Sequence, residues 1–194
     1  SIINLYGITR DSDTKNYMIV LQYAENGSLR NYLDTNGKLS WKAKILNLWY
    51  ITHGLHKIHL NELIHRDLHV GNILHDNFNA RITDMGLCKP ANYKALENTK
   101  NSVYGVLPYI APEILRGQDY TKAADIYSFG IIMYEIITGL PPYHDVSHDE
   151  NLGIKICQGL RPRFNIKVPQ SIVHLIKECL DAIPLNRPTA IDIF

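Results

Sequence analysis

Two short side chains that carry oxygen atoms, Asp67 and Asn72, lie in the stretch "LIHRDLHVGNIL" (63–74), which has apolar residues at both ends. A third, Asp84, ends the strand-like fragment "ARITD". Magnesium prefers carboxylate and amide oxygens together with waters and substrate phosphates. Phosphoryl transfer needs the metal and the phosphates held in place, and an acceptor for the proton of the attacking hydroxyl. Two of these side chains on the metal, with an aspartate as the base, would supply that chemistry.

A helix and two short strands are expected to position these side chains. From Trp41 to His59, apolar residues recur at helical spacing, which predicts one long amphipathic helix before the loop. The fragments "NIL" (72–74) and "ARITD" (80–84) are typical of strands around the polar turn "HDNFN". Residues 85–110 show little periodicity, and a long irregular segment in a compact domain usually has a function.

The rest of the chain predicts a strand hairpin followed by helices. "INLYGI" and "YMIVLQY" are apolar runs around the polar turn "TRDSDTKN", and "AENGSLRNYL" leads into a short helix. Helical spacing predicts further helices at 122–139, 151–158 and 171–180. Because the sequence contains no internal repeat and no linker, it predicts one domain.

Composition excludes several classes of protein. With 45% hydrophobic and 20% charged residues, the chain is typical of a globular protein, and a net charge of +1 without basic runs argues against nucleic-acid binding. The apolar stretch 126–140 contains Glu135, so we interpret it as a buried helix and expect no membrane span. Three cysteines without CxxC spacing argue against a disulfide framework and favour the reducing cytoplasm.

Three motifs in order give the chain a resemblance to a known family. "HRDL" with Asn72, "DMG" (84–86) and "APE" (111–113) resemble the catalytic loop, the metal loop and the end of the activation segment of eukaryotic protein kinases, closest to the tyrosine-kinase-like group. The resemblance implies an α+β, protein-kinase-like fold over residues 1–194. Residues 1–23 would be antiparallel strands of the small lobe and the start of the hinge, and residues 24–194 the mostly α-helical large lobe.

The resemblance also implies roles in catalysis and structure. Asp67 would accept the proton of the substrate hydroxyl, while Asn72 and Asp84 would hold Mg²⁺ on the phosphates of ATP. The other motif residues would act as follows: His65 as a structural residue, Asp125 as an anchor for the backbone of the catalytic loop, and Glu113 as the partner of Arg187.

Further residues would bind the nucleotide or take part in regulation. In the hinge, Leu21 would be the gatekeeper. The other nucleotide-binding residues would be Gln22 and Ala24 through their backbones, Ser28 near the ribose, and Leu74. Arg66 could pair with a phosphate on the activation segment, with Thr99, Ser102 and Tyr104 as candidate acceptors.

Four positions depart from the family's pattern, and three of them leave the acceptor class open. His69 stands where serine/threonine kinases carry a lysine, and Val106 where they carry a threonine. Tyrosine kinases have a tryptophan at the place of Tyr109, so we favour serine or threonine as acceptor. Met85 replaces a phenylalanine and, being apolar, can pack in its place.

Three other family features are absent. The sequence has no G-x-G-x-x-G, its first lysine is Lys15 in the predicted turn, and its first glutamate is Glu25 in the predicted hinge. We therefore expect a truncated kinase domain without the glycine-rich loop, the small-lobe lysine and its helix glutamate. Two hypotheses follow: an ATP- and Mg²⁺-dependent kinase that acts on a protein substrate in intracellular signalling, or an inactive fragment or pseudokinase that serves as a scaffold.

Two other groups of residues are expected to have no special chemistry. His53, His56 and His59 fall three apart on the predicted helix, but no cysteine or carboxylate stands at ligand spacing, so solvated or capping histidines are expected. Cys88 follows the metal loop and has only Lys89 as a basic neighbour, which favours an ordinary small side chain over a reactive thiol.

Overall fold

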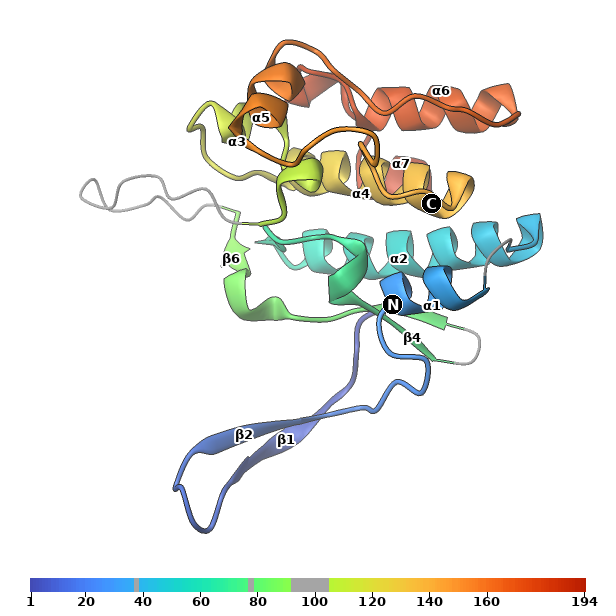
Figure 1. Cartoon of the computed structure of the whole chain (residues 1–194). Helices are drawn as coiled ribbons and strands as arrows, with labels where there is room; N and C mark the ends of the chain where they lie inside the picture. The colour runs from blue at the N-terminus through green and yellow to red at the C-terminus, as the bar shows by residue number, and fades with distance from the viewer. Residues whose placement is uncertain (37–38, 77–78, 92–104) are drawn as a thin grey trace.

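A helix that is buried almost all round, α4 (Lys122–Thr138), forms the centre of the molecule in the computed structural model (Figure 1). The structure describes residues 1–36, 39–76, 79–91 and 105–194. Because a helix with apolar residues on every side must be covered by other elements, α4 lies inside the protein and not on its surface. The helix ends at Gly139, whose φ of 74° is the left-handed conformation that favours glycine at this position.

The longest helix, α2 (Trp41–Leu60), lies beside α4 (Figure 1). Ser40 caps its first turn by accepting a hydrogen bond from the backbone N–H of Ala43 at 3.2 Å. Its inner face buries Ile51, Leu55 and Ile58 in the common core.

Shorter helices surround this pair. The α6 helix packs on α4, α7 on α2, and α5 on α3. The bounds of the remaining helices and 3-10 turns are α1 (Leu29–Asn36), η1 (Val70–Asn72), η2 (Met85–Leu87), η3 (Leu107–Tyr109), α3 (Pro112–Leu115), α5 (Glu150–Cys157), α6 (Gln170–Cys179), η4 (Pro184–Asn186) and α7 (Ala190–Ile193).

Three antiparallel strand pairs complete the described part of the fold. The first pair, β1 (Leu5–Arg10) and β2 (Tyr17–Leu21), extends away from the helices at the bottom of Figure 1 and leaves most of its side chains exposed. The second, β4 (Ile73–Asp76) and β5 (Asn79–Ile82), packs against α2. The third joins β3 (Leu63–Ile64) to β6 (Lys89–Pro90).

The described elements agree closely with those predicted from the sequence. The four helices whose bounds were predicted (α2, α4, α5 and α6) begin and end within one residue of those bounds, and the strand hairpin and the β4–β5 pair are present. The apolar stretch 126–140 is indeed a buried helix, and within the described residues no helix is long and apolar enough to cross a membrane. The fold is α+β, as predicted.

A buried ion pair joins Arg187, which follows η4, to Glu113 of α3. Arg187 donates two hydrogen bonds to the carboxylate of Glu113, each 2.7 Å long, and also donates to the backbone oxygens of Ala123 and Asp181. Both side chains are buried. A buried charge is tolerated when it is paired and hydrogen-bonded in this way, whereas removal of one partner leaves the other charge buried without a counter-charge.

We therefore expect Glu113→Gln to lower the free energy of unfolding by about 3–5 kcal/mol, measured by urea titration, because it leaves Arg187 buried without a counter-charge. The matched control is Glu62→Gln, which removes the exposed Glu62–Lys122 pair (2.8 Å) and should cost less than about 1 kcal/mol. Equal losses for the two variants would contradict the importance of the buried pair.

Candidate active site

The open end of the β4–β5 pair brings Asn72 and Asp84 close together. Ile73, the first residue of β4, pairs with Ile82, the last residue of β5. Asn72, just before β4, and Thr83, just after β5, therefore lie side by side. The backbone N–H of Thr83 donates to the backbone oxygen of Asn72 at 2.9 Å. Asp84 therefore follows directly after a residue that is hydrogen-bonded to Asn72.

The amide of Asn72 connects this strand end to Asp67. Its Nδ2 donates to the backbone oxygen of Asp67 at 3.0 Å and to the carboxylate Oδ2 of Asp67 at 3.1 Å. Within the described residues, no hydrogen bond reaches Oδ1 of Asn72. The nitrogen of this side chain thus fixes Asp67, while its oxygen remains available to a metal ion.

Asp84 adopts a left-handed backbone conformation, with φ 55° and ψ 66°, that aspartate tolerates better than most residues. One carboxylate oxygen accepts a hydrogen bond from the backbone N–H of Gly86 at 3.3 Å, and the side chain is exposed. Met85 packs against the core, in agreement with the apolar role expected for it. An amide oxygen and an exposed carboxylate are a donor set that fits Mg²⁺.

His65 is fully buried and links the loop before Asp67 to the end of β5. Its Nε2 lies 2.9 Å from the backbone oxygen of Thr83, and its Nδ1 lies 3.3 Å from the backbone N–H of Asp67. A backbone oxygen only accepts and a backbone N–H only donates, so these contacts assign the ring proton to Nε2. The ring therefore bridges the backbone of Thr83 and the backbone of Asp67.

Asp125, in the first turn of α4, binds the backbone of the same loop. Its Oδ2 accepts from the backbone N–H of His65 at 2.8 Å, and its Oδ1 from that of Arg66 at 3.0 Å. His59 Nε2 lies 2.9 Å from Oδ2. The expectation of a solvated His59 is therefore wrong: the ring is buried, because it faces the carboxylate of α4 and not the solvent.

Arg66, next to the candidate base, has a φ of 73°. Its guanidinium lies 4.6 Å from the centre of the Tyr120 ring and donates to the backbone oxygen of Leu87 at 3.4 Å. The candidate phosphate acceptors Thr99, Ser102 and Tyr104 lie outside the described residues.

The residues expected at the nucleotide lie where β2 meets α1 and β4. Leu21 ends β2 and is exposed, while Ala24 is buried. Ser28 pairs with Leu74 of β4 through an isolated backbone bridge. The side chain of Gln22 donates to Asp76 at 3.2 Å.

Sequence reasoning missed a buried polar cluster behind the catalytic loop. Glu135, in the middle of α4, forms an ion pair with Arg30 of α1 and accepts a hydrogen bond from the hydroxyl of Tyr109. Burial, followed by the charge of Glu135, raises the pKa of Tyr109. The only signal in the sequence was a lone glutamate in an apolar helix, which does not identify its partners.

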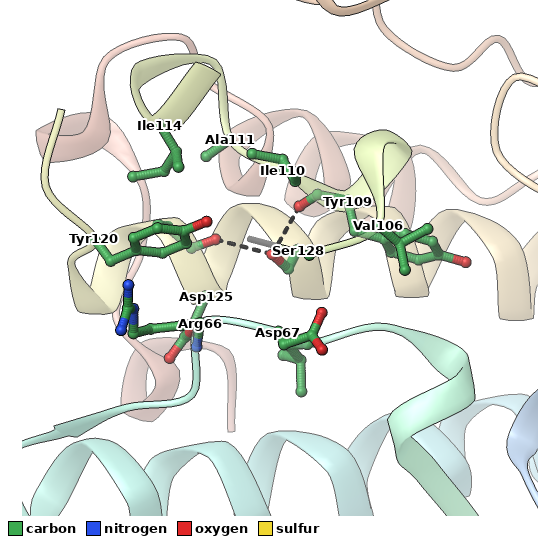
Figure 2. A pocket seen from close by; sticks show the side chains of 13 residues that line it. Arg66, Asp67, Val106, Tyr109, Ile110, Ala111, Ile114, Tyr120, Asp125 and Ser128 are labelled. Atoms are coloured by element: carbon green, nitrogen blue, oxygen red, sulfur yellow. Dashed lines mark hydrogen bonds between the residues drawn. The ribbon is translucent and has the colours of Figure 1, made fainter. Parts of the chain in front are cut away.

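The same tyrosine anchors the segment that faces Asp67. Figure 2 shows Asp67 and Arg66 across a small cavity from residues 105–114, with Ser128 of α4 donating to the backbone oxygen of Tyr109 at 2.8 Å. Gly105 has a φ of 110°, and a Cβ there would lie 3.3 Å from Oδ1 of Asp67. The segment therefore lies directly over the candidate base.

The cysteines give no sign of reactive chemistry. Burial raises the pKa of Cys88 and raises that of Cys179 to about 12, so both thiols hold their protons at neutral pH. This agrees with the expectation that Cys88 is an ordinary small side chain.

Known proteins match this chain over nearly its whole length. The protein kinase domain family matches residues 1–194. The serine/threonine-protein kinase PrkC of Bacillus subtilis is 32% identical over 191 residues, which cover 96% of this chain and 29% of PrkC. A probable serine/threonine-protein kinase of Dictyostelium discoideum is 36% identical over 178 residues, 89% of this chain and 16% of that protein. A putative serine/threonine-protein kinase/receptor of Acanthamoeba polyphaga mimivirus is 35% identical over 181 residues, 92% of this chain and 11% of that protein. The chain thus spans less than a third of each relative.

The contacts of Asp125 lead to a prediction about the catalytic loop. An asparagine has only one acceptor oxygen, so in Asp125→Asn one of the two backbone N–H groups loses its acceptor. We therefore expect the free energy of unfolding to fall by about 2 kcal/mol. The backbone amides of His65 and Arg66 should exchange faster with deuterium in the native state, measured by NMR. The control Asp119→Asn changes an exposed carboxylate and should leave this exchange unaltered. Unchanged exchange in Asp125→Asn would contradict the anchoring role.

Proposed function

This chain belongs to the protein kinase domain family, and we propose that it transfers the γ-phosphate of ATP to a hydroxyl group of a protein substrate. The observation that carries the proposal is the connected set Asp67, Asn72 and Asp84. One amide ties the candidate base to the strand end that presents the candidate metal ligands. Positioning and electrostatic stabilisation provide most of the catalysis in phosphoryl transfer, so such a connected set matches the needs of the reaction.

Each of the three side chains has a separate task in this proposal. Asp67 accepts the proton of the attacking hydroxyl, with its Oδ2 held by Nδ2 of Asn72. The amide oxygen of Asn72 and the carboxylate of Asp84 would hold Mg²⁺. When bound, the metal neutralises charge on the phosphates and orients them.

The nucleotide and regulatory residues belong to the same proposal. Leu21, Gln22, Ala24, Ser28 and Leu74 would contact the adenine and ribose of ATP, a role supported by the bridge that joins Ser28 to Leu74. His65, Asp125, Glu113 and Arg187 would hold the large lobe in its working shape, and Arg66 would respond to phosphorylation of the activation segment.

We propose serine or threonine as the phosphate acceptor, because the relatives are named serine/threonine-protein kinases and because Tyr109 precedes "IAPE". Membership of the tyrosine-kinase-like group, a place in cytoplasmic signalling and the extent of the two lobes (1–23 and 24–194) are the finer parts of the same proposal.

The test is transfer of labelled γ-phosphate from Mg·ATP to a mixed set of serine, threonine and tyrosine peptides. Removal of a general base typically costs about 10²–10⁴-fold in rate, so Asp67→Asn should lose at least about a hundredfold in kcat. The control Asp119→Asn should match the wild type, and the labelled amino acid identifies the acceptor class. If the wild type binds Mg·ATP or a partner but transfers nothing, the proposal is wrong, and the chain is an inactive fragment or a pseudokinase that serves as a scaffold.

A second prediction concerns the metal. Asp84→Asn replaces a charged oxygen ligand with a neutral one, so the Mg²⁺ concentration for half-maximal transfer should rise by about tenfold or more. A titration of the transfer rate with Mg²⁺ at fixed ATP measures this change. An unaltered Mg²⁺ requirement in Asp84→Asn would remove this residue from the metal site.

A further inference from the structure

His69 occupies the start of the η1 turn, between the candidate base and Asn72. Its backbone is extended, with φ −153° and ψ 166°, and its Nδ1 accepts a hydrogen bond from the backbone N–H of Gly71 at 3.0 Å. Because a backbone N–H can only donate, this contact requires an unprotonated Nδ1. In the neutral ring the proton is then on Nε2.

Nε2 of His69 faces the oxygen of Asp67 that Asn72 does not bind. The distance from Nε2 to Oδ1 of Asp67 is 3.6 Å. This Oδ1 is buried and has no hydrogen-bond partner within the described part of the chain. A buried carboxylate oxygen without a hydrogen-bond donor is energetically costly. Nε2–H of His69 is the donor that faces it.

The surroundings keep the ring in place and favour its neutral form. The side chain is largely buried, and its ring centre lies 5.9 Å from that of Tyr109. The charged and titratable groups that face it are Asp67, His65, Asp84 and Arg30. Burial has the largest effect and lowers the pKa of His69, against the opposing charge of Asp67.

We propose that His69 is a positioning residue, whose Nε2–H closes onto Oδ1 of Asp67 when the substrate is bound and holds the carboxylate for proton transfer. The proposal rests on the function proposed above. A separation of 3.6 Å is beyond hydrogen-bond range, but contacts of this kind are commonly long in ligand-free sites and tighten in the complex. A base that is oriented by a third group is a recurring arrangement in enzymes.

The competing explanation is that His69 only caps the η1 turn through Nδ1. Two substitutions separate the two uses of the ring. In His69→Asn, the side-chain oxygen can replace Nδ1 as the acceptor for Gly71, since asparagine is a favoured cap, but no donor reaches Asp67. In His69→Gln, the longer amide can place an N–H near Oδ1 of Asp67, while the acceptor at the position of Nδ1 is lost.

We expect His69→Asn to lower kcat by on the order of tenfold without changing the KM for ATP, because the base is misplaced and the nucleotide site is not. His69→Gln should retain most of the wild-type kcat. In the Asp67→Asn background, His69→Asn should cause no further loss, because its effect acts through Asp67. Steady-state kinetics on the peptide set measure all three variants.

The opposite pattern would overturn the inference. Full activity in His69→Asn, a larger loss in His69→Gln, or additive losses in the double variant would each assign His69 to the turn alone. Imidazole ¹⁵N shifts provide a readout that does not need activity. A protonated Nε2 whose resonance moves in Asp67→Asn supports the inference, and a proton on Nδ1 or an unmoved resonance overturns it. A wild type that transfers no phosphate would contradict only the proposed function.

Discussion

The carboxylate of Asp125 is the constraint on which the rest of the site depends. The backbone N–H groups of His65 and Arg66, in the loop before Asp67, donate to the two oxygens of this carboxylate, and Arg66 also has a positive φ. Such a backbone persists only where its surroundings fix it. One buried carboxylate from α4, supported by His59 of α2, binds both N–H groups and so joins the loop to the two central helices. The position of the candidate base is thereby set by the core.

Buried charge recurs where segments without regular structure must be held. Glu113 and Arg187 join α3 to the end of η4, and Glu135 binds Arg30 and Tyr109 under the segment that covers Asp67. Apolar packing is not directional, so it holds a helix well but specifies an extended loop poorly. Hydrogen bonds to buried carboxylates have fixed geometry and fix loops at defined points, although each carboxylate must be fully paired to be tolerated.

The sequence was sufficient to predict the helices and strands, but not the side-chain contacts between them. Helical periodicity gave the bounds of α2 and α4 because each keeps one pattern over many residues. The side-chain types of Asp67, Asn72 and Asp84 marked them as one chemical set, but the hydrogen bond from Asn72 to Asp67 was not predicted. Periodicity could place His59 on a helix, but the carboxylate that it faces is 66 residues away, so its burial could not be read from the local pattern. The pairing of Arg30 with Glu135 was missed for the same reason. The roles assigned to the site residues stay predictions.

The choice of an amide at position 72 follows from the two demands made on that side chain. A carboxylate there could bind a metal, but it could not donate to Asp67, and it would place a second negative charge beside the base. Two negative charges so close together would repel each other. The amide instead donates to Asp67 through Nδ2 and leaves Oδ1 for the proposed metal, without adding a charge. Asp84 has no such second contact with the base, so a full negative charge can be used there. The difference between the two candidate ligands thus reflects their different distances from Asp67 along the hydrogen-bond chain.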